Sequence, residues 1–463
     1  MHNRLRLARA VTRIVKTTAV IGAALLALIV TPAATAVAST GVHVPCEGGA
    51  VGLVDAINAA NLAGGGTISL ASGCTYTLTS VNNTAGMLGD GNGLPLITSR
   101  IIINGSDNET GNAAMQGENG NEGTTIAGIG VANGAGFRIF EVDGPGGNLT
   151  LNGLIITKGF GLAGGGILNV EGAATLNHSQ VTGNTGAGGG GGIASGIVDP
   201  NHLGPIGAVT LNHSQVNGNI ALGGGGGGIL NRAGALTLNF SQVDNNISRG
   251  GGGGIASGTG NGGTAGDSKL ILNYSQVNNN TSTGGPNAGA GGVANGGTAV
   301  ITHSQVNHNT APGASGGGIL NHGTMTINLS EVNGNKAPKA GLNDDGTGGG
   351  IANLSFALFG ASTSGVLTIN SSQVNDNSAS GIGGGILEDG ILPGPPPPAP
   401  PTFGAPGGKL ILDHSQVTEN SSADGGGIFS SSGSPVSLVH ATRVRDNTPN
   451  NCIPLESIPG CSG

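Results

Sequence analysis

A single repeating unit dominates this chain of 463 residues and limits the folds open to it. The unit begins with Gly-Gly-Gly-Ile or a close variant, runs through a turn of variable length to Leu-Thr-Leu-Asn-x-Ser-Gln-Val, and has Asn three residues after that Val. The Ile position recurs nine times, at Ile167, Ile193, Ile229, Ile255, Val293, Ile319, Ile351, Ile386 and Ile428. The Val position recurs at Val181, Val216, Val243, Val277, Val306, Val332, Val374, Val417 and Val444. The Asn follows in all nine units, at Asn184, Asn219, Asn246, Asn280, Asn309, Asn335, Asn377, Asn420 and Asn447. A unit that recurs in this way indicates a solenoid with one coil per unit.

Each unit contains short alternating segments such as Leu236-Thr237-Leu238, and a period of two predicts strands. A strand this short cannot bury its apolar side alone, so coils must stack about 4.8 Å apart as a parallel β-helix. The Ile, Leu and Val columns then form a continuous core. We expect the Asn column to adopt the left-handed conformation at a sharp corner and to bond amide to amide between coils. The glycine runs are expected at another corner, where backbones crowd and positive φ is needed.

Residues 39–160 precede the regular coils, which span residues 161–449, and residues 450–463 are expected to form a C-terminal cap. Helical spacing of Leu53, Ala56, Ile57 and Ala60 predicts a short amphipathic helix that closes the open end of the core. Strand-like segments follow at 67–70, 101–103, 125–126, 137–142 and 149–156, and these predict less regular first coils.

Residues 1–38 are expected to be a secretory signal peptide. Five basic residues precede an apolar run over 19–30, which is shorter than the roughly 20 residues that span a bilayer, and Ala36-Val37-Ala38 is a small-residue cleavage site. We therefore expect a secreted, extracellular or cell-surface protein without a membrane span after cleavage, present as a monomer. In an exported chain the four cysteines predict two local disulfides, Cys46 with Cys74 and Cys452 with Cys461; free or cross-paired thiols are the alternative.

The charge of the chain argues against two classes of partner. Without residues 1–38, 11 of the 16 basic residues and all 24 acidic residues remain, so the net charge is 11 − 24 = −13. An acidic surface disfavours nucleic acid and anionic lipid. The glycine runs lack a following Lys-Ser or Lys-Thr, which argues against nucleotide binding. With no Trp and 2% aromatic residues, a row of rings for stacking on sugars is not evident either.

The Gly-Gly-Gly-Ile and Val-x-x-Asn elements resemble the GGA[ILV] and FxxN repeats of the chlamydial polymorphic outer membrane proteins, with Val in place of Phe. The N-terminal region resembles the start of secreted bacterial β-helix proteins of pectate-lyase-like fold, through Cys46, Leu53-Val54-Asp55-Ala56-Ile57, Gly65-Gly66-Thr67-Ile68 and Gly73-Cys74-Thr75-Tyr76-Thr77-Leu78. The resemblance covers nearly all of the chain after the signal peptide and implies a right-handed parallel β-helix. It also implies a polysaccharide lyase or glycoside hydrolase as one possible activity.

One column of the repeat becomes acidic in three successive coils, at Asp376, Glu419 and Asp446. Stacking would place these carboxylates roughly 5 Å apart, where like charges repel by about 1 kcal/mol even in water. A weakly bound Ca²⁺ or similar cation would relieve that repulsion. The alternative is an exposed acidic edge balanced by Arg443 and Arg445.

Three other polar features favour structural roles. The residue before the repeat Ser forms a column with His178, His213, His303 and His414, but also Phe240, Tyr274, Leu329 and Ser371. Most of the non-His members cannot replace an imidazole ligand, so we expect a stacking ladder rather than a metal ladder. Asn343-Asp344-Asp345-Gly346 is interpreted as a solvated turn. Asn321-His322-Gly323 aligns with Asn231-Arg232-Ala233, so His322 is interpreted as a variant of a turn position.

Four coils are longer than the rest, and all their extra residues enter at one corner, near 195–208, 257–268, 354–365 and 388–408. Insertions on one side of a solenoid often mark an interaction face. The loops carry Phe356, Phe359 and Phe403, and the last carries a proline-rich arm over 393–401. We expect these loops to bind a surface protein or a cell-wall or extracellular polysaccharide; alternatively they cover a sheet face.

These patterns favour a non-catalytic extracellular β-helix scaffold, adhesin-like or glycan-associated, with no assigned catalytic residue and no cofactor beyond the weak Ca²⁺. The alternative is a carbohydrate-active β-helix enzyme, a polysaccharide lyase or glycoside hydrolase. A bare structural coat protein is a third possibility, and the four long loops argue against it.

Overall fold

The computed structural model describes residues 41–105, 123–130, 136–196, 207–258, 268–285, 289–341, 344–358, 361–389, 408–431, 434–454 and 458–461. The chain divides into residues 1–38 and residues 39–463. The expected signal peptide therefore lies outside the described residues. None of the described helices is long and apolar enough to cross a membrane.

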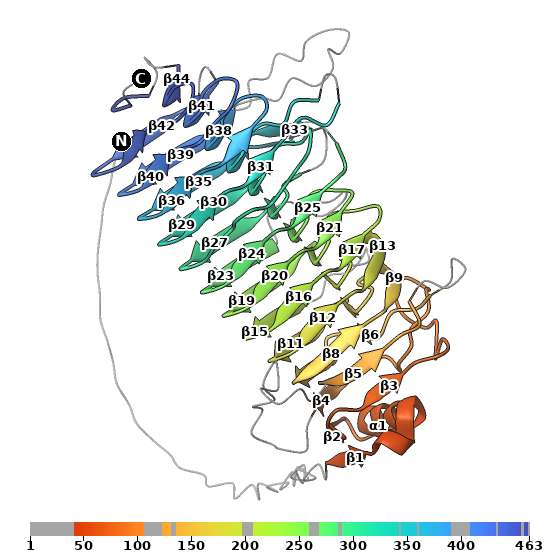
Figure 1. The fold of residues 1–463 in the computed structure, drawn as a ribbon. Helices are drawn as coiled ribbons and strands as arrows, with labels where there is room; N and C mark the ends of the chain where they lie inside the picture. Colours follow the sequence, from red (N-terminus) through yellow and green to blue (C-terminus); the bar gives the residue numbers. More distant parts are fainter. Residues whose placement is uncertain are drawn as a thin grey trace, which may run out of the picture. The chain divides into compact units, whose positions relative to one another are not determined.

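The described residues after position 40 form a right-handed parallel β-helix, as the repeat predicts (Figure 1). The first sheet has 13 strands: β1 (Val42–Val44), β2 (Gly65–Leu70), β4 (Arg100–Asn104), β7 (Asn148–Asn152), β11 (Ala173–Asn177), β15 (Ala208–Asn212), β19 (Gly234–Asn239), β23 (Ser268–Asn273), β27 (Thr298–Thr302), β29 (Thr324–Asn328), β35 (Val366–Asn370), β39 (Lys409–Asp413) and β42 (Val436–Val439). The second sheet has 11 strands: β6 (Phe140–Val142), β10 (Ile167–Asn169), β14 (Ile193–Ser195), β18 (Ile229–Asn231), β22 (Ile255–Ser257), β26 (Val293–Asn295), β28 (Ile319–Asn321), β32 (Ile351–Leu354), β38 (Ile386–Asp389), β41 (Ile428–Ser430) and β44 (Cys452–Ile453).

Two narrower faces complete each coil. The third face comprises a seven-stranded sheet of β3 (Thr75–Thr77), β5 (Thr124–Ala127), β8 (Leu154–Thr157), β12 (Gln180–Thr182), β16 (Gln215–Asn217), β20 (Gln242–Asp244) and β24 (Gln276–Asn278), continued by β30 (Glu331–Asn333), β36 (Gln373–Asn375), β40 (Gln416–Thr418) and β43 (Arg443–Arg445). The fourth comprises β9 (Phe160–Ala163), β13 (Thr185–Gly189), β17 (Ile220–Ala221), β21 (Ile247–Ser248), β25 (Thr281–Ser282), β31 (Lys336–Ala337) and β37 (Ser378–Ala379). One coil thus runs from the first sheet through the third and fourth faces to the second sheet.

Every coil sends the same apolar positions inward, because equivalent strands pair in register. Val209 pairs with Leu236 and Leu211 with Leu238, and all four side chains are fully buried. Together with the Ile and Val columns they join one continuous hydrophobic cluster that runs from the N-terminal helix to the C-terminal cap. Parallel pairing in register places each residue beside the equivalent residue of the next coil. The repeat in the sequence therefore determines which side chains contact one another in the core.

The repeat Asn of each unit lies inside the coil, and our expectation for its backbone was wrong. Asn246 is fully buried and is absent from the residues with positive φ, whereas Asn245, immediately before it, has φ of 57°. The sharp bend is therefore made by the preceding residue, which leaves the Asn side chain pointing inward. The predicted amide bonding is present: Asn246 Nδ2 donates to Asn280 Oδ1 at 3.0 Å and to the Val216 carbonyl at 2.8 Å.

The glycine runs form the corner between the fourth face and the second sheet, as expected. Gly226 has φ of 72°, and a Cβ there would lie 2.3 Å from the Ile229 carbonyl oxygen. Backbone of neighbouring coils crowds this corner, and only glycine combines positive φ with so little space.

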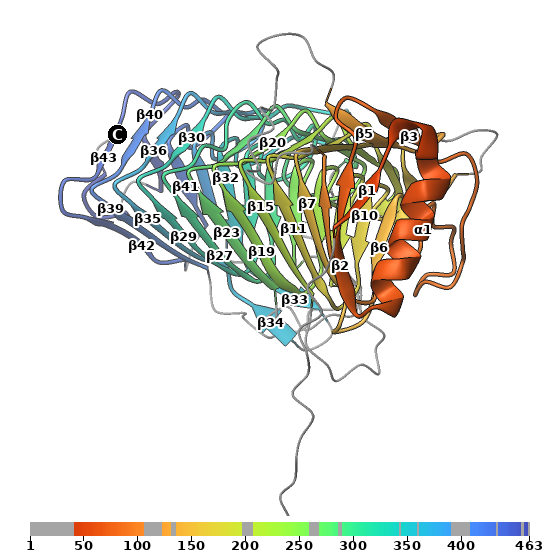
Figure 2. The ribbon, with the colours of Figure 1, turned by 90° about the horizontal axis from the view of Figure 1, so that it is seen from below.

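Both ends of the coil stack agree with the sequence. After the short 3₁₀ turn η1 (Cys46–Gly48), helix α1 (Gly49–Leu62) packs Leu53, Ala56, Ile57 and Ala60 against the first coil (Figure 2). The predicted disulfides are formed, with Cα–Cα distances of 5.7 Å for Cys46–Cys74 and 6.3 Å for Cys452–Cys461. These elements cover the apolar core where coil stacking stops.

The four long connections all join the second sheet to the first, so they enter at one corner. They link β14 to β15, β22 to β23, β32 to β35 and β38 to β39. Most of the loop residues, including Phe359, Phe403 and the proline-rich arm, lie outside the described residues. Phe356 belongs to β33 (Phe356–Leu358), which pairs antiparallel with β34 (Ala361–Thr363). Binding by these loops stays a prediction.

Candidate functional site

The corner between the first sheet and the third face carries a ladder of stacked rings. The ring ladder consists of His178, His213, Phe240, Tyr274 and His303. Successive ring centroids are 5.0, 5.0, 5.0 and 4.6 Å apart, and all five residues have φ between 48° and 50°. The left-handed backbone turns each side chain outward, and Phe240 and Tyr274 are each 53% exposed. The predicted stacking ladder is confirmed, although the sequence had not suggested so long a row of rings.

An outer column of Asn side chains flanks the ring ladder on the first sheet. Asn177, Asn212, Asn239 and Asn273 each donate from Nδ2 to Oδ1 of the preceding coil, over 2.8–3.0 Å. An amide has two N–H donors and two oxygen lone pairs. The ladder uses one donor and one acceptor of each inner member, which leaves one of each per coil for other partners.

A column of Gln side chains flanks the ring ladder on the other side, along the third face. It contains Gln180, Gln215, Gln242 and Gln276, each at the first position of its strand. Neighbouring amides support it, since Asn217 Nδ2 donates to Gln215 Oε1 at 3.1 Å. Across these coils the corner is therefore a strip of neutral hydrogen-bonding groups with ring edges in the middle.

The same columns end in a charged cluster near the C-terminus. Asp413 occupies the place of the outer Asn, and its Oδ1 lies 2.6 Å from Nδ1 of His414 and 2.7 Å from Nδ1 of His440. The two imidazoles stack with centroids 4.9 Å apart. The hydrogen bond from His440, with a smaller contribution from His414, holds the pKa of the Asp413 carboxyl below its ordinary value. Acid and imidazole groups thus meet at the surface.

The three predicted cation ligands Asp376, Glu419 and Asp446 are all exposed and lie at left-handed positions with φ of 56–61°, on successive coils. Asp446 contacts Arg445, which fits the alternative of a charge-balanced edge. Among the described residues, the group of acidic and His side chains close enough to share a metal is instead Asp413, His414 and His440. Cation binding by Asp376, Glu419 and Asp446 stays a prediction.

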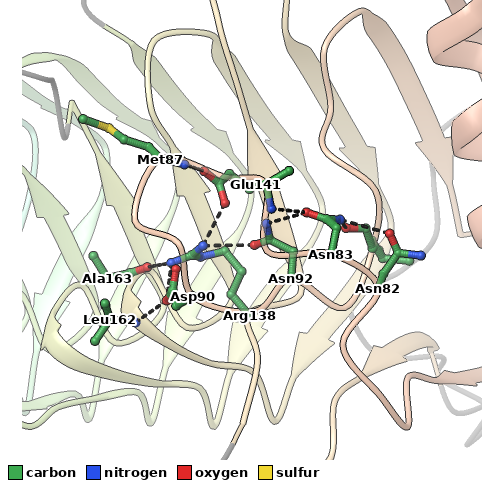
Figure 3. A network of polar contacts seen from close by, with 11 residues as sticks. Asn82, Asn83, Met87, Asp90, Asn92, Arg138, Glu141, Leu162 and Ala163 are labelled. Atoms are coloured by element: carbon green, nitrogen blue, oxygen red, sulfur yellow. Dashed lines mark hydrogen bonds and ion pairs between the residues drawn. The ribbon is translucent and has the colours of Figure 1, made fainter.

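A buried ionic network in the first coils was missed by sequence reasoning (Figure 3). Arg138 is fully buried and pairs with Asp90 at 2.7 Å and with Glu141 at 2.8 Å. Glu141 Oε1 also accepts from the Met87 backbone at 2.8 Å, and Asp90 Oδ2 accepts from the Leu162 backbone at 2.6 Å. The network fastens the segment that carries Met87 and Asp90 to the strands beneath. Two charges within an apolar strand pattern over 137–142 were the signal available in the sequence.

Two other predicted positions have structural roles. Asp345 forms an exposed ion pair with Lys339 at 2.9 Å, consistent with a solvated turn; Asn343 lies outside the described residues. His322 occupies the turn predicted by alignment: its backbone N–H donates to the Asn295 carbonyl, as that of Arg232 donates to Ser195.

His322 is expected to make stability depend on pH. Burial lowers the pKa of His322 below its ordinary value of 6.5, and a hydrogen bond with the Leu354 backbone only partly opposes this. As the pH falls below about 6.5, His322 becomes protonated in the unfolded chain but stays neutral in the folded chain. The free energy of unfolding therefore decreases with falling pH until the pH reaches the lowered pKa of the folded chain. The free energy of unfolding, measured by urea titration at pH values between about 8 and 5, should fall less with pH in His322→Gln than in the unaltered protein. Equal losses in both proteins would contradict this assignment.

No protein-family model and no curated protein matches the sequence. Two solved structures are similar to the chain: the A-module of mannuronan C-5 epimerase AlgE6 of Azotobacter vinelandii, at 15% identity and TM-score 0.46, and the A-module of AlgE4 of the same organism, at 13% and 0.47. The first match covers 85% of this chain and 94% of that module, and the second covers 86% and 95%.

Proposed function

We propose that residues 39–463 act outside the cell as a non-catalytic scaffold that binds an extended polysaccharide along the corner between the first sheet and the third face. The observation that carries this proposal is the strip of three adjacent columns: outer Asn, ring ladder and Gln. The two disulfides and the acidic composition support an exported protein whose partner is neither nucleic acid nor anionic lipid.

The chemistry of the strip suits sugar hydroxyls. A hydroxyl both donates and accepts, and so does an amide, so a neutral amide column can bind a polyhydroxylated chain without the desolvation cost of a buried charge. The columns repeat once per coil, and the ring spacing of 4.6–5.0 Å is comparable to the length of one sugar residue in an extended chain. A bound chain running along the coil axis would meet the same donors and acceptors at every residue.

The rings are expected to contribute through their edges. Each inner ring is stacked between two neighbours with interplanar angles of 8° or less, so its faces are covered. A sugar therefore cannot stack on a ring face except at the ends of the ladder. Hydrogen bonds from the flanking amides provide most of the binding energy. The stacked rings keep the surface of this corner rigid and exclude part of the water from it.

A carbohydrate-active enzyme is the second candidate, favoured by Asp244 on β20 of the third face. Burial raises the pKa of the Asp244 carboxyl above its ordinary value, while a hydrogen bond from the Asn278 backbone opposes the shift. A carboxyl that keeps its proton to higher pH suits general acid catalysis on a glycan. Asp244 lies in a column whose neighbours Asn217 and Asn278 are neutral, so a second carboxylate partner is not evident there.

One experiment tests both candidates. Purified residues 39–463 are incubated with insoluble cell-wall and plant polysaccharides, and both the retained protein and the unsaturated or reducing ends released are measured. We expect retention without product, and an affinity lower by roughly 30-fold for the double variant Asn239→Ala/Tyr274→Ala, since two lost contacts at about 1 kcal/mol each total about 2 kcal/mol. Product that disappears in Asp244→Asn would favour the enzyme instead.

The matched control changes the neighbouring corner. Asn245 and Asn279 lie between the third and fourth faces at φ of 57° and 56°, so Asn245→Gly/Asn279→Gly preserves the backbone and leaves the strip intact. This variant should be retained like the unaltered protein. Equal retention of the Asn239→Ala/Tyr274→Ala variant and the unaltered protein would count against the strip as the binding surface.

A further inference from the structure

The cluster of Asp413, His414 and His440 has the composition and placement of a metal site. Asp413 and His414 come from the end of β39, and His440 follows β42 on the next coil. One possible ligand atom from each residue lies within 4.8 Å of the other two, and Asp413 Oδ1 contacts Nδ1 of His414 at 2.6 Å and Nδ1 of His440 at 2.7 Å. His414 and His440 have φ of 48° and 50°, so the backbone at both corners turns the imidazoles to the same side.

The geometry is close to what a first-row divalent ion requires. Zn²⁺ binds imidazole nitrogen and carboxylate oxygen at about 2.0–2.2 Å in tetrahedral sites, which separates ligand atoms by roughly 3.3 Å. The distance from Asp413 Oδ1 to each Nδ1 therefore needs to increase by roughly 0.6 Å, from hydrogen-bond contact to metal coordination. Both His side chains are more than half exposed, so their side-chain torsions can provide this movement, and an ion can enter from solvent.

The chain contains its own comparison for this cluster. His178 and His213 stack in the same way, with centroids 5.0 Å apart, and they too have left-handed backbone. The residues beside them in the outer column are Asn177 and Asn212, which are already joined by a hydrogen bond of 2.9 Å. An amide oxygen is a weak neutral ligand, whereas Asp413 offers a carboxylate. The carboxylate distinguishes the C-terminal His pair from the His178–His213 pair.

We propose that Asp413, His414 and His440 bind one first-row divalent cation, with Zn²⁺ as the expected ion and water in the remaining coordination positions. Nitrogen ligands favour such ions over Ca²⁺, which prefers six or more oxygens. Because the ligands come from two successive coils, the ion joins the last two turns of the first sheet. The proposal does not rest on polysaccharide binding.

Isothermal titration of tag-free residues 39–463 with ZnCl₂ tests the site. We expect one Zn²⁺ per chain, and a fall in affinity of more than about tenfold in both Asp413→Asn and His440→Gln, since even partners outside the coordination sphere change affinity by about 10- to 100-fold. Zn²⁺ should also raise the melting temperature of the unaltered protein and leave that of Asp413→Asn unchanged. Excess Ca²⁺ should not displace the Zn²⁺.

The matched control variants are His178→Gln and His213→Gln, which remove the His pair that lacks a carboxylate. Both should bind Zn²⁺ with the affinity and stoichiometry of the unaltered protein. The proposal is overturned if the unaltered protein takes up no Zn²⁺, or if Asp413→Asn and His440→Gln bind it as tightly as the unaltered protein does.

Discussion

Replacing Arg138 by methionine is expected to lower the free energy of unfolding by about 3–5 kcal/mol, the largest single effect we predict. Arg138 is fully buried and pairs with Asp90 and with Glu141, itself fully buried (Figure 3). Methionine fills a similar space, but it leaves the Glu141 carboxylate in the interior without its cation. An uncompensated buried charge costs far more than the ion pair contributes, so removal of one partner is strongly destabilising.

Equilibrium unfolding in urea, followed by circular dichroism, measures this effect. The control is Lys339→Met, which breaks an ion pair of similar length, 2.9 Å, whose side chains are 47% and 49% exposed. Exposed pairs contribute about 0–1 kcal/mol, so this variant should unfold almost as the unaltered protein does. A loss for Arg138→Met no larger than that of Lys339→Met would contradict the assigned role of the network.

Substitution of Asn246 by alanine should lower the free energy of unfolding by roughly 2–4 kcal/mol. Its side chain donates to the Val216 carbonyl, and its Oδ1 accepts from the Asn219 backbone N–H at 2.9 Å. Alanine removes the donor to the Val216 carbonyl and the acceptor of the Asn219 N–H, whereas Asn280 Oδ1 keeps its bond from the backbone N–H of residue 246. Each unsatisfied buried group costs about 1–3 kcal/mol. Because the Asn column is continuous, the substitution should also weaken the hydrogen bonds of the two neighbouring coils.

The adjacent residue provides the control for Asn246→Ala. Asn245 has φ of 57° and is exposed, and the equivalent positions in other coils are Gly183, Gly218 and Gly334. Asn245→Gly should therefore change the free energy of unfolding by less than about 0.5 kcal/mol. Urea unfolding of the two single variants compares the free energy of unfolding after loss of an inward Asn with that after loss of an outward Asn one residue away. Similar decreases in both variants would rule out a special role for the interior Asn column.

Regular parts of the fold could be predicted because one period is repeated. Leu236 and Leu238 follow a two-residue alternation that predicts their burial, Val243 belongs to an apolar column that recurs in every unit, and helix α1 follows from the spacing of Leu53, Ala56 and Ile57. The left-handed conformation was predicted for the repeat Asn, but the residue before it has this conformation. Asn tolerates left-handed backbone in general, and the sequence does not show which of two adjacent polar residues points inward.

The two ionic clusters, Arg138 with Asp90 and Glu141 and Asp413 with the two His, could not be predicted, because each joins residues that are far apart in the chain. Asp90 meets Arg138 only through the irregular segment before β4, whose path has no repeat to guide it. His440 was missed for a more local reason: one extra residue, Ala441, separates it from Thr442, which replaces the repeat Ser, so His440 falls out of the aligned column. His440 nevertheless stacks on His414, so the extra residue is accommodated within the corner and His440 lies in the ring position of its coil.

The sequence by itself determined the coil and the core columns, because a parallel helix in register places each residue over its equivalent one unit away. It also indicated the two disulfides, because the four cysteines form two pairs that are close in sequence. Only the tertiary structure decided which polar side chains face solvent and which meet across coils. At the corner between the third and fourth faces, a left-handed residue before each repeat Asn leaves that Asn pointing inward, whereas at the corner between the first sheet and the third face the left-handed residue itself carries the outward ring. The second of these bends also places His440 beside Asp413 in the last coils. Such bends depend on the backbone path, which a pattern of residue types does not specify.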